Sequence, residues 1–337
     1  MRKSGILLTV GVMLLLLASV LFVLVMTFNG WNFSKFNIGN YKEESFPVDK
    51  DFSNITIDSE TDDILLLPSE DGKCKVFCRS EEGINYSVEV IDGRLSVNMK
   101  DERGWYDRIS SYGGKIILYL SKDRYDSLTI DTDTSDIEIN KIFSFGELKI
   151  SLSTGDVKNY ATVLGTLDVT ASTGNISNYG SVGDALNITA STGDIKIRDV
   201  SAKAVKLSVS TGRINVENLT CEENINIKVS TGEVRLDNVS CRNLSSNGST
   251  GDITLKSVVA SGSFDIKRST GDIKFDAADA AEITVKTDTG YVKGTLLSSK
   301  IFYVNSDTGK IEVPKSTKGG ICEITTDTGD VVIGIKE

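Results

Sequence analysis

A Ser-Thr-Gly or Asp-Thr-Gly tripeptide recurs ten times in this chain, and it constrains the fold more than any other feature. Successive glycines are 19 or 20 residues apart. A period of this length is typical of a solenoid, in which each repeat buries its apolar face only by stacking on its neighbours. Ser135, 20 residues before the first glycine, marks an eleventh, degenerate copy. The ten glycines are Gly155, Gly174, Gly193, Gly212, Gly232, Gly251, Gly271, Gly290, Gly309 and Gly329.

The residues around each glycine predict β-structure. The residue two positions after it is always Val or Ile, and the residues seven and five positions before it are almost all apolar. Ser246 is the one polar residue in the second of these columns. Polar residues alternate with the apolar ones, which is the period-2 pattern of a strand. Residues 131–337 are therefore predicted to form an all-β, parallel β-solenoid (β-helix) of about eleven coils of 19–20 residues.

The glycine predicts a sharp turn between two strands of a coil, because glycine adopts positive φ without steric cost. Two other interpretations of the motif are an aspartic protease and a calcium-binding β-roll. Aspartic proteases use Asp-Thr-Gly to hold paired carboxylates, but Asp288, Asp307 and Asp327 only replace a serine of the repeat. Calcium-binding β-rolls carry aspartate in every turn, whereas Arg213 and Tyr291 interrupt the column after glycine here. We expect no catalytic residues, no cofactor and no metal.

The N-terminus carries a second strong signal. Residues 6–28 are 23 uncharged, mostly apolar residues that follow Arg2 and Lys3. This length suits a transmembrane helix and exceeds a typical signal-peptide core. The basic tip, residues 1–5, is then cytoplasmic, and the rest of the chain lies outside a cell membrane crossed once. A cleaved signal peptide is the alternative.

Residues 29–45 are predicted to be a linker, and residues 46–130 an N-terminal cap of short strands separated by glycine turns. A solenoid needs such a cap because its terminal sheet edges are open to aggregation. The loop between residues 101 and 114 contains Trp105 and Tyr106, which are candidate binding residues. The alternative is a hairpin loop that packs its own aromatic side chains.

Composition limits the functions open to the chain. The net charge is -10, so no polycationic face for nucleic acid is expected. The chain contains no histidine, which removes Ser-His-Asp and histidine-zinc chemistry. Coils of 19–20 residues also leave no room for the long loops that carry carbohydrate-active sites. We therefore expect a protein that is not an enzyme.

The five cysteines are an odd number, which argues against a dedicated disulfide framework. Cys221 and Cys241 hold the same place in consecutive repeats and should be stacked neighbours. The sequence leaves open whether they form a disulfide or a ladder of free thiols.

A basic column follows the glycines by three residues. Lys158, Lys196 and Arg235 belong to it and recur on every second coil, beside acidic residues. One interpretation is charge pairing on a solvated face, which contributes little per pair. The other is a binding surface for an anionic cell-wall polymer, and these three residues are its candidate contacts.

The repeated Ser-Thr-Gly-Asp-Ile unit resembles a bacterial family of unknown function whose members are named as candidate adhesins. The resemblance rests on residues 153–157, 191–195 and 269–273, and it covers the chain from Phe52 onward. It implies a β-solenoid behind one N-terminal membrane anchor, and it supplies no catalytic residues. The first function it suggests is a surface adhesin or a structural, polymer-binding protein. The second is an accessory or regulatory protein of a cell-envelope stress response, acting through a membrane or protein partner.

Overall fold

The computed structural model describes residues 41–103 and 113–336. Every regular element within them is a β-strand, and none of these residues belongs to a helix long and apolar enough to cross a membrane. The predicted cytoplasmic tip, the transmembrane segment at 6–28 and residues 29–40 of the linker lie outside this part of the chain. The chain divides at Lys42, and residues 43–337 form the compact unit described below.

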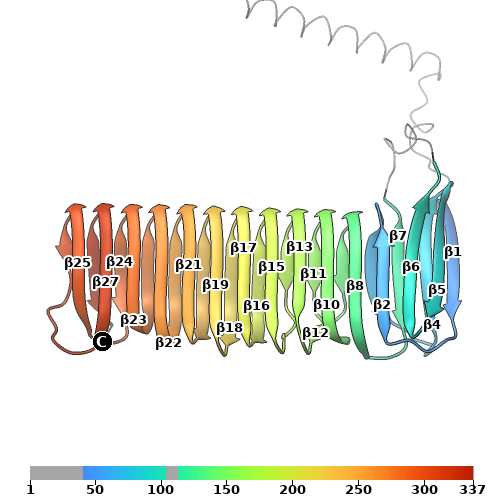
Figure 1. Cartoon of the computed structure of the whole chain (residues 1–337), viewed down its shortest axis with the longest axis horizontal. Coiled ribbons are helices and arrows are strands. Elements are labelled where there is room, and N and C mark those ends of the chain that lie inside the picture. The colour runs from blue at the N-terminus through green and yellow to red at the C-terminus, as the bar shows by residue number, and fades with distance from the viewer. Residues whose placement is uncertain (1–40, 104–112, 337) are drawn as a thin grey trace, which may run out of the picture. The chain divides into compact units, whose positions relative to one another are not determined.

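This unit is an all-β, parallel β-solenoid, the fold that the sequence predicted (Figure 1). Each coil contributes one strand to a first sheet, before the turn, and one to a second sheet, after it. The first sheet contains β2 (Asn54–Ser59), β6 (Arg94–Asp101), β8 (Arg124–Thr134), β10 (Ser144–Thr154), β13 (Leu167–Thr173), β15 (Ala185–Thr192), β17 (Ala204–Thr211), β19 (Asn224–Thr231), β21 (Asn243–Thr250), β25 (Lys300–Thr308) and β27 (Gly320–Thr328).

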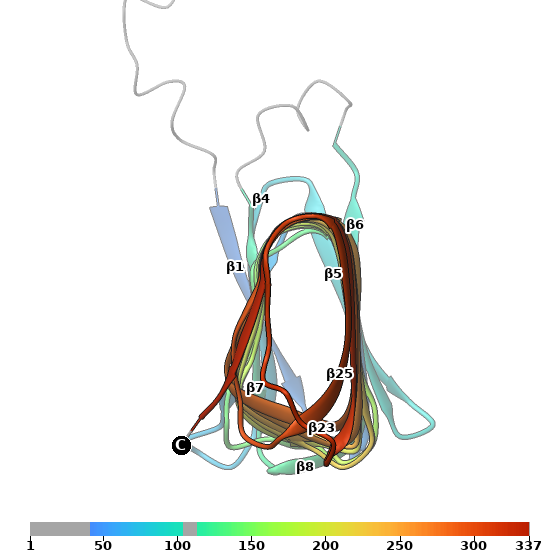
Figure 2. The ribbon, with the colours of Figure 1, turned by 90° about the vertical axis from the view of Figure 1, so that its left-hand side faces the viewer.

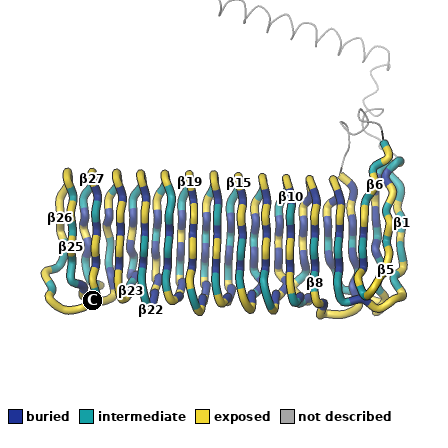
Figure 3. Tube along the Cα trace, in the orientation of Figure 1, coloured by how far each residue is buried: buried dark blue, intermediate teal, exposed yellow. Residues whose placement is uncertain are grey.

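The second sheet contains β3 (Asp63–Pro68), β7 (Lys115–Leu120), β9 (Ile137–Ile139), β11 (Val157–Asn159), β14 (Ile176–Asn178), β16 (Ile195–Ala202), β18 (Ile214–Cys221), β20 (Val234–Cys241), β24 (Val292–Leu296), β26 (Ile311–Glu312) and β28 (Val331–Ile335). Two long strands, β22 (Ile253–Thr270) and β23 (Ile273–Thr289), run through both sheets, and the short β12 (Thr162–Val163) lies in a return segment. Along the strands, buried and exposed residues alternate (Figure 3).

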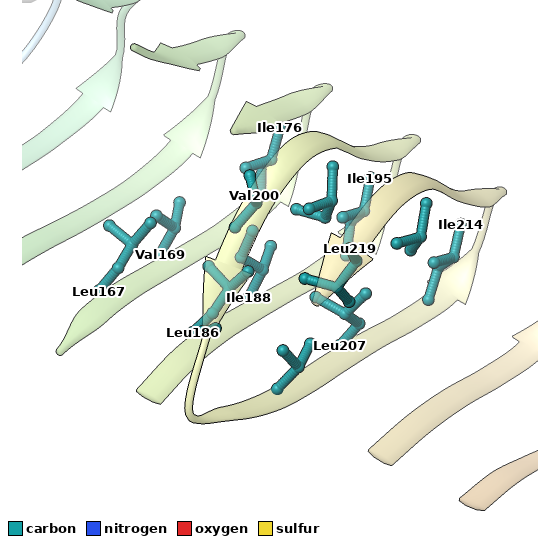
Figure 4. Packing of buried hydrophobic residues seen from close by; sticks show 14 of the residues in the cluster. Leu167, Val169, Ile176, Leu186, Ile188, Ile195, Val200, Leu207, Ile214 and Leu219 are labelled. Carbon is teal, nitrogen blue, oxygen red and sulfur yellow. The ribbon is translucent and has the colours of Figure 1, made fainter. Parts of the chain in front are cut away.

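Equivalent residues of successive coils stack in register, so the apolar columns of the sequence become columns of the core. Ile195 pairs with Ile214, and both are fully buried. Leu186 pairs with Val205 in the first sheet, and these side chains are also buried. The inward direction of both columns confirms the alternation predicted from the sequence (Figure 4).

The glycine of each turn is required for two reasons. Nine of the ten repeat glycines, all except Gly309, have φ between 126° and 155°, a region that side chains other than glycine rarely enter. All except Gly155, which lies against Ser135, also lie against the glycine of the neighbouring coil, and a Cβ added at Gly212 would be 2.0 Å from the Gly193 carbonyl oxygen. The turn is held between coils, where the Gly212 N–H donates to Thr231 O at 3.0 Å.

A second corner follows within the strands after the turn, and the sequence analysis missed it. Asp199, Asn218 and Asn238 have φ of 56°, 52° and 55°, which Asn and Asp tolerate better than other side chains. Their side chains form a ladder, in which Asn218 Nδ2 donates to Asp199 Oδ1 at 2.7 Å. The corner bends the chain into the base of the coil, giving the elongated loop seen along the axis in Figure 2.

The order of coils in space departs from their order in sequence at both ends. At the C-terminal end, β27 pairs with β23 on one side and with β25 on the other. At the N-terminal end, β2 lies between β6 and β8. The outermost rungs are therefore β25–β26 and β6–β7, and the chain returns inward after each of them (Figure 1).

The predicted cap region, residues 46–130, contains two kinds of structure. The β2–β3 and β6–β7 rungs continue the parallel stack, which therefore begins before residue 131. Beyond them, β5 (Ile84–Ile91) pairs antiparallel with β6, and β4 (Cys74–Glu81) pairs antiparallel with β7. The strand β1 (Tyr41–Val48) pairs with β4. We call β1, β4 and β5 the antiparallel cap.

The interior column that contains Gly248 also contains a charged side chain. Arg268 is 3% exposed and occupies a column of otherwise small or aliphatic residues beside Gly248. Its guanidinium donates to Lys267 O at 3.0 Å and to Ser246 Oγ at 3.3 Å, while its Nε finds no acceptor among the described residues. Burial lowers the pKa of Arg268 to about 10, so it is charged at neutral pH. Ser246, the polar exception in its column, thus supplies an acceptor for a buried cation.

Candidate functional site

The outer surface of the second sheet carries two rows of mostly polar side chains, one and three residues after each glycine. We call these rows the charged stripe. In the second row, Lys158, Ser177, Lys196, Asn215 and Arg235 stack in register on consecutive rungs. A cation therefore recurs on every second rung, at intervals of about 10 Å along the rod.

Part of the stripe forms a shallow groove of about 280 Å³. Lys196, Arg213 and Arg235 line it together with Asp194 and Glu233, so three cations face two carboxylates and the groove carries a net charge of +1. Arg213 pairs with Asp194 at 3.1 Å, and Arg235 pairs with Glu233 at 2.9 Å. Lys196 forms no ion pair with any described residue. We call this site the basic groove.

Lys158 lies in a different groove, of about 180 Å³, nearer the N-terminal end. Two cations, Lys158 and Lys115, face four carboxylates there, which gives a net charge of -2. The four are Asp63, Asp136, Glu138 and Asp156. The structure thus brings Lys196 and Arg235 together and places Lys158 in surroundings that disfavour an anion.

Sequence reasoning missed Arg213 as part of this surface. It stands directly after a glycine, in a column that is mostly acidic or amide. Among the ten repeats, only Arg213 and Lys310 are basic at this place. That departure from the column is the signal in the sequence that distinguishes Arg213.

The acidic residues of the stripe have a structural task. Asp156 Oδ1 accepts the backbone N–H of Asn175 at 2.8 Å, on the next rung. Asp194 Oδ1 accepts the N–H of Arg213 at 2.9 Å in the same way. These bonds satisfy N–H groups that the turn would otherwise leave unpaired. The recurrent Gly-Asp pair is therefore explained by turn stacking, and the described residues include no cluster of metal-ligating side chains.

The sequence also singled out an aromatic pair and a cysteine pair. Trp105 and Tyr106 lie outside the described residues. Cys221 and Cys241 are both free and buried. Burial raises the pKa of both thiols, that of Cys241 to about 12. They are therefore protonated at neutral pH and poor nucleophiles.

The chain matches the sequence profile of the family described as Toastrack DUF4097 over residues 52–240 and again over 223–337. No protein among the curated ones is similar to it. Three solved structures are similar at low sequence identity. A "putative lipid binding protein" of Parabacteroides distasonis is 19% identical, with a TM-score of 0.45 over 77% of this chain and 98% of that one.

The other two are each named "putative adhesin". That of Parabacteroides distasonis is 14% identical, with a TM-score of 0.44 over 77% of this chain and 96% of that one. That of Parabacteroides merdae is 16% identical, with a TM-score of 0.42 over 77% and 95%.

Proposed function

The chain belongs to the Toastrack DUF4097 family, and from that premise we propose that it is a membrane-anchored, non-enzymatic surface protein whose solenoid binds an anionic polymer of the cell envelope. Residues 6–28 supply the anchor and the solenoid lies outside the membrane. The absence of histidine from the chain and the protonated state of the buried thiols support a role other than catalysis.

The basic groove is the observation that carries this proposal. Cations outnumber carboxylates in it, and its lining residues come from three consecutive rungs of the rod. A polymer lying along the stripe meets a cation about every 10 Å. Each exposed charge contact contributes little alone. Useful affinity therefore requires several contacts at once, which a repeating ligand provides and a small anion does not.

Sedimentation of the full chain, held in detergent, with purified cell walls tests the proposal. We expect binding that weakens as salt rises, because the contacts lie at an exposed surface. The double variant Lys196→Ser/Arg213→Ser should bind about tenfold more weakly, since two exposed contacts are lost. The matched control is Lys158→Ser/Lys115→Ser, which removes the same charge from the groove of net charge -2 around Lys158.

We expect the control to change binding less than about twofold. Equal losses in the two double variants would mean that net charge, and not the basic groove, drives binding. Binding that high salt leaves unchanged would exclude the charged stripe as the polymer contact.

A further inference from the structure

The C-terminal end of the rod is open. The β25–β26 rung is outermost, and no described strand lies beyond it. Phe302 and Val304 of β25 are only partly buried, whereas Cys322 and Ile324, their neighbours one rung inward, are 1% and 0% exposed. The apolar columns of the core therefore end at a surface.

The two strands of this end differ in how far their edges are protected. Natural edge strands are commonly blunted by shortness, proline or inward-pointing charge. β26 is two residues long and is soon followed by Pro314. β25 spans nine residues without proline, and its one inward cation, Lys300, is neutralised by Asp279 at 2.7 Å. β25 is therefore an unprotected edge.

We propose that β25 pairs antiparallel with β25 of a second copy of this chain, giving a tail-to-tail dimer. An isolated peptide strand could satisfy the backbone of β25, but the open core columns require a partner with an apolar layer of the same section. The end of another rod has that layer. The antiparallel cap blocks the opposite end, so head-to-tail stacking is excluded and a closed two-fold pair remains.

A two-fold axis at Tyr303 gives this pairing a consistent register. Phe302 then opposes Val304 of the second copy, so inward columns meet inward columns across the junction. Tyr303, which is 61% exposed, opposes its own copy. The two charged residues of β25, Lys300 and Asp307, oppose serines, so no like charges face each other.

The dimer places the two copies' N-terminal caps at opposite ends of a doubled rod. β1 starts the described residues and belongs to the cap, roughly 120 Å from the cap of the partner if each rod is about 60 Å long. Where each copy is anchored by its N-terminus, which rests on the function proposed above, the pair joins two membranes. The partner recognised is then the same protein on a facing surface.

Sedimentation equilibrium of the full chain in detergent tests the pairing. We expect the protein mass to double with concentration over about 1–100 µM. Oxidation of Tyr303→Cys should link two chains by a disulfide. Ile91→Cys, in the cap strand β5 and also 61% exposed in the parent, is the matched control and should not link them.

Two proline variants make the test independent of folding. Neighbouring N–H groups of a parallel strand point to opposite sides. One of Tyr303→Pro and Val304→Pro therefore removes a bond to β27, and the other removes only the donor at the open edge. The variant that removes only the donor at the open edge should keep its melting temperature and weaken dimerisation at least about tenfold.

A monomer at about 100 µM would overturn the proposal, as would a dimer that both prolines leave intact. Linkage through Ile91→Cys would assign the contact to the cap instead. Every one of these variants keeps the basic groove. A failure to dimerise would therefore leave the polymer-binding proposal standing, and a failure to bind cell walls would leave the dimer proposal standing.

Discussion

At the N-terminal end of the rod, the outermost β6–β7 rung is covered by the antiparallel strands β4 and β5. At the C-terminal end, the outermost β25–β26 rung is covered by no described strand. Both rungs nevertheless share one property, because the chain returns to an inner rung after each of them, to β8 after β7 and to β27 after β26. The last strand, β28, is paired on both sides, by β24 and β26.

The comparison separates two problems that a rod faces at its ends. A chain terminus tends to fray unless it is tied down, and placing the terminal strand on an inner rung prevents this at the C-terminal end. An open sheet edge tends to pair with other chains, and only the antiparallel cap prevents that. The molecule resists fraying at its C-terminal end but leaves that edge available.

The largest expected effect contrasts the middle of the rod with its open end. Ile214 is fully buried and Ile311, the same position of the repeat, is 43% exposed. Ile214→Asp should destabilise the rod by several kcal/mol, because it buries an unpaired carboxylate. Ile311→Asp should cost about 0.5 kcal/mol, because its side chain can reach water. Urea unfolding of both variants measures the difference, and equal losses would show that the end rung is as closed as the middle.

A smaller effect is expected from the ion pair near the open end. The side chains of Lys300 and Asp279 are 4% and 15% exposed and lie 2.7 Å apart. Lys300→Met should cost about 3 kcal/mol, since it leaves a mostly buried carboxylate without its partner. Lys267→Met removes an exposed pair with Asp265 and should cost under about 0.5 kcal/mol in the same urea experiment. If Lys300→Met left the free energy of unfolding unchanged, the open end would have to rearrange so that water reaches Asp279.

The smallest effect concerns pH at the capped end. Asp62 is buried and accepts hydrogen bonds from Ser59 Oγ at 2.8 Å and Tyr86 Oη at 3.0 Å, but burial still raises its pKa above 3.8. Between the pKa of Asp62 in the unfolded state and its raised pKa in the folded state, the folded state binds more protons than the unfolded state. The Asp62 contribution to stability is therefore greatest in acid and falls as pH rises through that window.

Asp62→Asn should flatten this part of the pH profile of the melting temperature. Asp71 is the control with the opposite sign. Its hydrogen bond from Ser69 lowers its pKa, so any contribution it makes is lost as pH falls. A profile that Asp62→Asn leaves unchanged would show that another group governs the pH response of the cap.

The sequence specified the middle of the rod well and its ends poorly, for a physical reason. Columns such as Ile195 and Ile214 repeat because stacking demands it, so period and side-chain direction predict the core. The stacking surfaces of neighbouring repeats are nearly equivalent, so the repeat does not predict the order of the rungs in space. Gly309 and Gly329 both end an Asp-Thr-Gly tripeptide, yet Gly329 lies against Gly290 and Gly309 lies against Gly329, one rung further out.

The candidate site was predictable only in part. Lys196 and Arg235 could be placed on one face because their column has a strict period. Separating them from Lys158 required the β3–β7 and β3–β9 pairings, which bring Asp63 and Lys115 beside it from far away in sequence. That long-range order is set by the interleaved rungs, which carry no local signal.

The buried guanidinium of Arg268 gives one rung an identity that its neighbours lack. In a stack of near-copies, a rung displaced by one period would lose almost no apolar contact. Arg268 needs the space above Gly248 and the hydroxyl of Ser246, since a Cβ at Gly248 would lie 2.5 Å from the guanidinium. The rung before that presents Val229 at the same place. A rung displaced by one period would therefore bury the Arg268 charge without its acceptor. This single position thus favours one alignment of the rungs over all the alignments that the repeat alone would allow.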